Sequence, residues 1–454
     1  MTVSRRDFLR TSTIASSVLI LPRGLRAQSP IAPNARLQIA MIGVGGRGRA
    51  PLTALQDEQI VAFCDVDHER GRAGYSRDTK TKGLLERFTQ AKWFHDYRLM
   101  FEQMSEQIDA VVISVPDHMH YAIGMEAIRR GKHVYIEKPL CRCITEVRAL
   151  QAAAKKAGVV TQMGNQGRAA EGIRLAREWV QAGVLGNVHT VHAWTNHTHS
   201  LYSHAAYDDG ASATEAETPP STLQYDLWLG VAPQRPYRHS RSHQSWRGYV
   251  DYGCGALGDW ACHQLDAAFY ALDLSGPSSV EASASVEKKG TYPTSNTLTY
   301  RFPARGARPP VEVKWFDGGL FPPAPVEGFV FANNGGSIFY GDKGIMWVNS
   351  HSASARLLPE STMQQMQSTL PAKSIPRVIG GPHVEWVNAI RNHGRCGSNF
   401  DYAAPLAEIA LLGVAAVRAR TRLEWDAANA RVTNHAWANQ FIGPGYAYRP
   451  GWGV

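Results

Sequence analysis

The chain has 454 residues, of which 44% are hydrophobic and 19% are charged. This composition is typical of a globular protein and excludes bulk disorder, collagen and coiled coils. The net charge of +9 is unevenly distributed, and no block of Lys and Arg makes nucleic acid an expected partner. No run of about 18 apolar residues occurs, so we expect no membrane span.

The first 27 residues are typical of an export signal. Arg5 and Arg6 precede Phe8 and Leu9, and a short apolar stretch with several Ser and Thr residues follows. Such signals combine a basic start, a short apolar segment and a small residue at the cleavage point, and the arginine pair resembles a twin-arginine signal. We therefore expect cleavage near Ala27, the twin-arginine export machinery as a partner, and a periplasmic or otherwise exported protein.

Residues 34–165 have the pattern of a Rossmann dinucleotide-binding domain. Short apolar strands alternate with helices, which is typical of a parallel sheet covered on both faces. The expected strands are 36–43, 60–64, 109–115, 133–136 and 159–163, and the expected helices are 49–56, 121–130 and 145–157.

Residues 166–440 predict a second domain of the α+β class with an open, mostly antiparallel sheet. Within it, the long polar and aromatic segment 197–252 is expected to form a loop region beside the active site, because loops of that length are usually functional or disordered. The tail 441–454 is expected to lie over the surface without a helix. The expected strands are 188–194, 280–286, 295–302, 311–316, 329–331, 336–340 and 345–349, and the expected helices are 256–272, 383–393 and 404–420.

A glycine-rich loop follows the first expected strand. Gly43, Gly45 and Gly48 match the pattern G-x-G-x-x-G, in which the first glycine permits a tight turn and the second lets the backbone approach a pyrophosphate. The third lets helix and strand pack closely. With Gly46 and Arg47 between them, these residues are predicted to bind the phosphates of a dinucleotide.

Asp65 ends the second expected strand, about 20 residues after the glycine loop. A carboxylate at this position accepts hydrogen bonds from the adenosine ribose and repels a 2′-phosphate. The cofactor predicted from the sequence is therefore NAD, with NADP less favoured. Asp67 and Arg70 lie near enough in the sequence to weaken that distinction.

Two further clusters carry groups suited to proton transfer. Lys138 directly follows the strand 133–136, at the strand end where ligands bind in open α/β sheets. Asp259 and His263 are four residues apart and share one face of an expected helix. A neutral histidine can take a hydroxyl proton while hydride leaves the same carbon, and a neighbouring carboxylate or ammonium adjusts its pKa.

Taken together and in this order, the motifs resemble those of the Gfo/Idh/MocA family of oxidoreductases. The resemblance implies a Rossmann domain, a C-terminal α/β domain whose sheet forms homo-oligomers, and hydride transfer between a nicotinamide and a hydroxyl of a sugar, cyclitol or glycoside. It assigns Lys138, Asp259 and His263 as catalytic residues, with His263 as the general base, and it suggests a cis peptide bond before Pro139. The further residues assigned to the cofactor site are Pro116, His120, Glu137, Lys138 and Asn165.

An exported protein has no large pool of free nicotinamide, so released NADH would be lost. Either a tightly bound cofactor is reoxidised in place by a second substrate, or the cycle is redox-neutral: oxidation, elimination of a glycosidic group, addition of water and reduction. The leading hypothesis is a sugar or glycoside dehydrogenase with tightly held NAD(H). The alternative is an NAD-dependent glycoside hydrolase or lyase, and a third possibility is a sugar-binding protein without catalysis.

The sequence does not determine the roles of several other residues. The pair His197-x-His199 lacks the partners of a metal site, so no metal is predicted. The six cysteines have no spacing that indicates a zinc site or a particular disulfide. Four aromatic residues are candidates either for stacking on sugar rings or for core packing: Trp194, Trp228, Tyr237 and Trp246.

Overall fold

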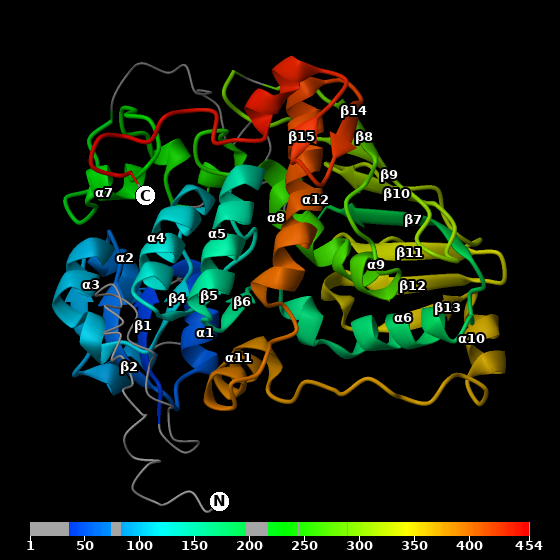
Figure 1. Cartoon of the computed structure of the whole chain (residues 1–454), viewed down its shortest axis with the longest axis horizontal. Coiled ribbons are helices and arrows are strands. Elements are labelled where there is room, and N and C mark those ends of the chain that lie inside the picture. Colours follow the sequence, from blue (N-terminus) through cyan, green and yellow to red (C-terminus); the bar gives the residue numbers. More distant parts are fainter. Residues whose placement is uncertain (1–35, 74–82, 197–216, 244, 288, 454) are drawn as a thin grey trace, which may run out of the picture.

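The structure is a computed structural model that describes residues 36–73, 83–196, 217–243, 245–287 and 289–453. It consists of two sheets with helices packed around and between them (Figure 1). The predicted export signal 1–27 and the pair His197-x-His199 lie outside the described residues.

The first sheet is the predicted parallel sheet. Its strand order is β3-β2-β1-β4-β5-β6, and every pairing in it is parallel. The central strand β4 is buried along its whole length, which explains its uninterrupted apolar run. The elements are β1 (Gln38–Ile42), α1 (Arg49–Ala54), β2 (Gln59–Cys64), α2 (His68–Ala73), β3 (Lys92–Phe94), α3 (Tyr97–Met104), β4 (Ala110–Ile113), α4 (Asp117–Arg129), β5 (His133–Ile136), α5 (Ile144–Ala157) and β6 (Thr161–Met163).

The second sheet has nine strands in the order β13-β12-β11-β7-β10-β9-β8-β14-β15. All of its pairings are antiparallel except that between β7 and β10. Its strands are β7 (Val188–Thr195), β8 (Ser279–Ala284), β9 (Asn296–Phe302), β10 (Val311–Asp317), β11 (Gly336–Gly341), β12 (Ile345–Asn349), β13 (Ala355–Leu358), β14 (Leu423–Asp426) and β15 (Arg431–Val432). The remaining helices are α6 (Glu171–Gln181), α7 (Tyr225–Leu229), α8 (Gly255–Gln264), α9 (Asp266–Ala271), α10 (Glu360–Met366), α11 (Gly381–Arg391) and α12 (Phe400–Ala419). Of these, α11 packs against the core of the first sheet.

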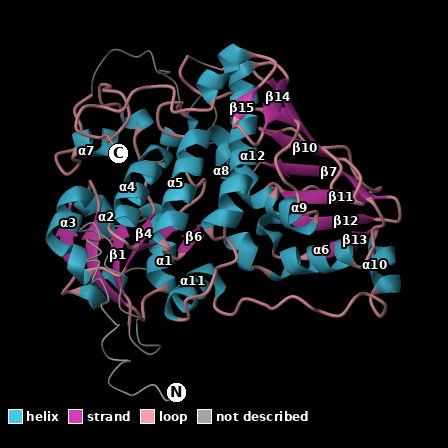
Figure 2. Cartoon of the chain, viewed as in Figure 1, coloured by secondary structure: helices cyan, strands magenta, loops and turns pink. Residues whose placement is uncertain are grey.

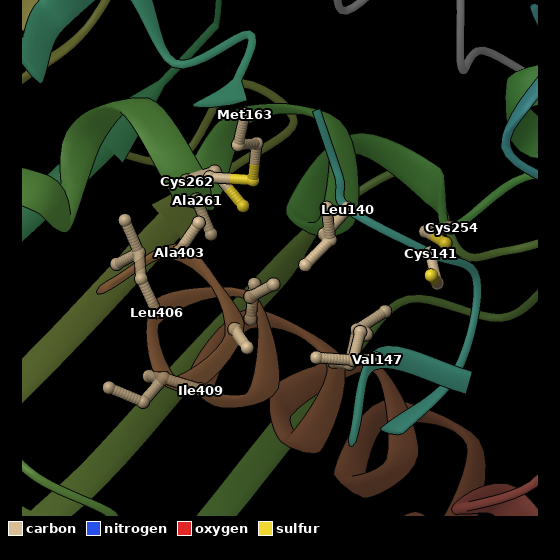
Figure 3. Packing of buried hydrophobic residues seen from close by; sticks show 14 of the residues in the cluster. Leu140, Cys141, Val147, Met163, Cys254, Ala261, Cys262, Ala403, Leu406 and Ile409 are labelled. Atoms are coloured by element: carbon tan, nitrogen blue, oxygen red, sulfur yellow. The ribbon is translucent and has the colours of Figure 1, made fainter. Parts of the chain in front are cut away.

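Helix α12 lies between the two sheets and joins their cores (Figure 2). Figure 3 shows its Ala403, Leu406 and Ile409 packed with side chains of α8 and with Met163 of β6. By length and composition α12 could cross a membrane, but 83% of its most apolar stretch is buried in the protein, which is typical of a core helix. This shared core fixes the position of α8 relative to the strand ends of the first sheet.

Most predicted elements occur, with differences that have local causes. The expected strand 329–331 is not a strand: Phe329 and Phe331 instead pack edge-on against Trp194. The expected helix 256–272 is two helices, α8 and α9, that meet at Leu265. The short strand β3, the helix α3 that follows it and the helix α6 were not predicted.

Candidate active site

The glycine loop adopts the conformation that its motif requires. Gly43 has φ +81°, and a Cβ on it would collide with the carbonyl oxygen of Ser114. A Cβ on Gly48 would collide with the carbonyl oxygen of Gly43, so strand β1 and the following helical turn pack as closely as expected. Gly45, by contrast, has space for a Cβ on its protein side, which agrees with a role in approach to a ligand rather than in packing.

Asp65 lies directly beside this loop. Its Oδ2 atom accepts hydrogen bonds from the backbone N–H groups of Val44, at 2.8 Å, and of Gly45, at 3.3 Å. Its Oδ1 atom accepts from Asp67 N at 3.1 Å. Burial raises the pKa of Asp65 from its ordinary value, while these N–H groups act in the opposite direction. Asp65 therefore joins the loop to the end of β2 and also lines the adjoining cavity.

We expect the substitution Asp65→Asn to weaken NADH binding by about 10-fold or more, since a hydrogen bond to a charged group contributes about 1.5–3 kcal/mol. NADPH should lose less or gain, because the carboxylate that repels the 2′-phosphate is gone. Dissociation constants for both cofactors, measured by titration, test this expectation. Equal losses would show that Asp65 acts only by holding the glycine loop.

One cavity of about 580 Å³ brings the three predicted catalytic residues together with most of the predicted cofactor residues. Its walls include the glycine loop and Asp65 at one end of the first sheet, Lys138 after β5, and Asp259 and His263 from α8. A volume of this order is typical of a ligand or cofactor site. Residues more than 200 positions apart in the sequence therefore line one cavity.

Lys138 and Asp259 form the centre of the polar network. The Lys138 Nζ atom donates to the backbone oxygen of Asp259 at 2.9 Å and forms an ion pair with Asp259 Oδ1. The other carboxylate oxygen of Asp259 lies 3.5 Å from Arg247 Nε. The Lys138–Pro139 peptide bond is cis, as expected from the sequence. This arrangement holds the ammonium group of Lys138 at the cavity wall.

His263 lies one helical turn after Asp259 and is 2% exposed. Its Nδ1 atom is buried and has no hydrogen-bond partner among the described residues. Burial lowers the pKa of His263 well below 6.5, and the nearby charges of Lys138 and His351 act in the same direction. The imidazole is therefore neutral at neutral pH and available to accept a proton.

Several cavity residues were not predicted from the sequence. Asp117 begins α4 and is buried; burial and the Asp259 carboxylate raise its pKa to about 7. His351 comes from the corner after β12, with φ +56°, and its ring centroid lies 4.6 Å from that of His263. Trp260 stands edge-on to both histidines. Asp117 directly follows Pro116, a residue assigned to the site from the sequence, whereas nothing local in the sequence marks His351.

Three residues assigned to the cofactor site do not line the cavity: Gly48, which packs closely against Gly43, and the pair His120 and Asn165. The ring nitrogens of His120 lie 2.8 Å from the carbonyl oxygen of Pro139 and 2.9 Å from that of Val115. His120 thus ties the turn after Lys138 to the end of β4, and it does not line the cavity. Asn165 also does not line it, because its Nδ2 atom donates to the buried carboxylate of Asp266 at 2.8 Å. Both hold elements that carry the site.

The other assigned residues do line the cavity. Pro116 and Gly46 form part of its wall, and Arg47 donates from Nε to Glu137 Oε1 at 2.9 Å. Glu137 Oε2 is buried without a hydrogen-bond partner in the described part of the chain. This oxygen lies close to Gly164, while Oε1 holds Arg47 at the cavity wall.

The aromatic candidates divide into two pairs. Trp228 and Trp246 line the cavity. Trp194 is fully buried in the second sheet, and Tyr237 packs edge-on against Tyr225. All six cysteines are buried and unpaired. Among the described residues, no group of three or more His, Cys, Asp or Glu side chains is arranged to hold a metal ion.

The residues that line the cavity are suited to binding a dinucleotide. The loop at Gly43 has no room for a side chain, Gly45 places none at the cavity wall, and Asp65 presents a carboxylate at the end of β2. The loop would hold the phosphates and Asp65 the adenosine ribose. The fold and the site thus define a class: oxidoreductases with a Rossmann domain and a second α/β domain that completes the cavity.

Comparison with known families specifies this class further. Residues 37–165 match the model described as the NAD-binding Rossmann fold of the GFO_IDH_MocA oxidoreductase family, and residues 170–307 match the model of its C-terminal alpha/beta domain. The chain therefore belongs to the Gfo/Idh/MocA oxidoreductase family, and its N-terminal domain is an NAD-binding Rossmann domain. The resemblance seen in the sequence and the predicted fold class are confirmed.

The individual relatives have low sequence identity to this chain and match only part of it. A glycosyl hydrolase family 109 protein of Solibacter usitatus is 30% identical over 32% of this chain and 34% of that protein. Levoglucosan dehydrogenase of Pseudarthrobacter phenanthrenivorans is 28% identical over 36% of this chain and 33% of that protein. The chain thus spans about a third of the length of these two relatives.

The fold is shared with solved structures over most of the chain. The WlbA dehydrogenase of Bordetella pertussis, in complex with NADH and UDP-GlcNAcA, has a TM-score of 0.59 and 16% identity, over 87% of this chain and 99% of that one. A levoglucosan dehydrogenase in complex with NADH and levoglucosan has a TM-score of 0.54 and 18% identity, over 86% of this chain and 99% of that one.

Proposed function

We propose that the protein transfers a hydride between tightly held NAD(H) and a hydroxyl-bearing carbon of a sugar, cyclitol or glycoside. The observation that carries this proposal is that Lys138, Asp259 and His263 meet in the same cavity as the glycine loop and Asp65. Relatives named as levoglucosan, inositol and glucoside dehydrogenases support the substrate class.

The chain's own residues supply binding and proton transfer. His263, neutral and at the cavity wall, accepts the proton of the substrate hydroxyl as the carbon–oxygen double bond forms. Lys138 donates a hydrogen bond to the same oxygen and stabilises the negative charge that develops on it. Asp259 holds the ammonium of Lys138 and the guanidinium of Arg247 in place. Bound NAD⁺ supplies the acceptor for the hydride that leaves the carbon.

The alternative, a redox-neutral glycoside hydrolase or lyase, is favoured by one observation: two relatives are named as glycosyl hydrolase family 109 proteins. Oxidation of a ring hydroxyl would acidify the neighbouring C–H, a glycosidic group would then be eliminated, and water addition and reduction would complete the cycle. The same Lys138 and His263 would serve the oxidation and the final reduction.

One experiment separates the two functions. The protein as purified is mixed with aryl glycosides without added cofactor, and phenol release is followed together with the near-ultraviolet absorbance of reduced nicotinamide. Steady phenol release supports the hydrolase, whereas a stoichiometric burst of reduced cofactor without phenol supports the dehydrogenase. Neither signal, together with no bound nicotinamide, would support the non-catalytic sugar-binding protein.

We further propose that residues 1–27 direct export through the twin-arginine pathway and that the mature protein is periplasmic. The paired Arg5 and Arg6 support this proposal. Replacing both with Lys should leave the protein unprocessed in the cytoplasmic fraction. Processing and export that continue unchanged would contradict it.

We also propose a homo-oligomer formed through the second sheet. Along β9 and β10, buried positions alternate with half-buried ones, so that one face of these strands packs on the core while the other is only partly covered. Light scattering during size-exclusion chromatography tests this, and a monomer at micromolar concentration would contradict it.

A further inference from the structure

The chain segment 443–453, here called the strap, is fastened to both domains by side-chain hydrogen bonds. Tyr446 donates to the backbone oxygen of Asp251 at 2.9 Å. Tyr448 donates to Glu146 Oε1, on α5, at 2.6 Å. Figure 1 shows the strap, in red, running from the end of the second domain across to α7. It is therefore a fixed part of the structure.

Arg449 attaches the strap to one wall of the cavity. Its guanidinium donates to Asp226 Oδ1 at 2.6 Å, to the backbone oxygen of Asp226 at 2.7 Å and to that of Gly230 at 2.8 Å. Asp226 belongs to α7, whose Leu227 and Trp228 line the cavity. This wall cannot move away from the strap without breaking these hydrogen bonds.

Trp452 brings the strap to a second wall, at α3. The Arg98 guanidinium lies 4.0 Å from the centroid of the Trp452 ring and donates to the backbone oxygen of Gly451 at 3.2 Å. Arg98 is in turn held by the carboxylate of Asp96. Asp96, Tyr97 and Trp452 all line the cavity, and Trp452 is only 7% exposed.

This second wall adjoins Asp65. The backbone N–H of Asp65 donates to Phe94 at 3.0 Å, and His95 Nδ1 lies 3.2 Å from the backbone oxygen of Asp65. Because the carboxylate at the end of the second strand binds the adenosine ribose in Rossmann domains, the wall built by residues 95–97 and Trp452 is at the adenosine end of the site.

We propose that Trp452 packs against the adenosine part of bound NAD and that the strap closes this end of the cavity, so that the cofactor dissociates slowly. An indole offers a large apolar surface that stacks favourably on a base. Release of the dinucleotide would require the strap to separate from α3 or from α7. The inference rests on the binding of NAD in this cavity and adds a cofactor-binding residue that lies far outside the Rossmann domain.

The test compares Trp452→Ala with the unmodified protein in two binding measurements. The rate of NADH dissociation, followed by stopped-flow displacement with excess NAD⁺, should increase about 10-fold or more. The affinity for ADP-ribose, which has the adenosine end but no nicotinamide, should fall by a similar factor. Trp452→Phe should retain most of both, because it keeps an aromatic ring.

Trp437→Ala is the matched control, since Trp437 is 51% exposed and does not line the cavity. It should leave both measurements unchanged. Unaltered NADH dissociation in Trp452→Ala, or faster dissociation with unchanged ADP-ribose affinity, would overturn the proposal for Trp452. Failure of the unmodified protein to bind NADH would instead overturn the proposed function, so the two failures are distinguishable.

Discussion

Replacing His263 with Ala should lower kcat by about 10²–10⁴-fold, the usual contribution of a positioned general base. The imidazole accepts the substrate proton in the proposed reaction, so its removal takes away the proposed base. Binding of NADH should change little, because the proposed binding residues of the dinucleotide are the glycine loop and Asp65, and the substitution leaves both intact. Steady-state rates and NADH titration measure the two effects separately.

The matched control for this substitution is His189→Ala, an exposed histidine on β7. It should leave both kcat and NADH affinity unchanged. If His263→Ala retains normal turnover, the assignment of His263 as the base is wrong. If it instead loses NADH binding and stability together, the histidine is structural.

The pH profile gives an independent readout for the same residue. Because burial lowers the pKa of His263 well below 6.5, the neutral base persists as the pH falls through 6.5. We therefore expect kcat to show no acid limb at pH 6.5, where an ordinary histidine would be half protonated. A limb centred at 6.5 that disappears in His263→Gln would show that the imidazole is solvated like a surface histidine.

Replacing Lys138 with Ala is expected to have an effect of the same order, about 10²–10⁴-fold on kcat. The ammonium stabilises the oxygen from which the proton departs, so its loss should act on kcat more than on KM. Lys138→Arg should restore only part of the rate, because a planar guanidinium does not reproduce a compact ammonium held by two oxygens of Asp259.

Removal of Lys138 also takes away one of the two cations that lie beside the Asp259 carboxylate. The free energy of unfolding must therefore be measured together with activity. Arg247 Nε remains 3.5 Å from the Asp259 carboxylate and limits this cost. Lys156→Ala, at an exposed position near the end of α5, is the control and should change neither quantity. A Lys138→Ala variant that is folded, binds NADH and turns over normally would remove Lys138 from the reaction.

The predicted residues that the structure brings to the cavity or its glycine loop are those whose positions follow from local structure. Gly43 and Gly48 are required by a tight strand-to-helix turn, and Asp65 and Lys138 directly follow strands of a parallel sheet. Their side chains must meet at one edge of that sheet, whatever the rest of the chain does. His263 was predicted by its spacing within one helix.

The residues that were missed reach the cavity through tertiary structure alone. His351 arrives from the corner after β12 and Trp452 from the strap, each without a motif around it. Conversely, His120 and Asn165 were assigned to the cofactor from sequence order, and the fold uses them to hold turns behind the cavity wall. Sequence position places a residue near a strand end but does not determine which way its side chain points.

Errors in the secondary structure have a similar origin. The apolar run 329–331 has the composition of a strand, but its aromatic rings are used to cover Trp194. In contrast, the helix expected at 404–420 occurs as α12, and its apolar character reflects its packing against elements of both domains. For residues 329–331, packing partners far away in the sequence decided the outcome.

The most direct test of the account is a single-turnover experiment on the cofactor-loaded protein. The protein is saturated with NAD⁺ and mixed with a panel of sugars, cyclitols and aryl glycosides, while the near-ultraviolet absorbance of reduced nicotinamide is recorded. We predict a rise with at least one compound, at most stoichiometric with bound cofactor, that is about 10²–10⁴-fold slower in His263→Ala. Bound NAD⁺ that stays oxidised with every compound, or an equally fast rise in His263→Ala, would contradict hydride transfer with His263 as the base.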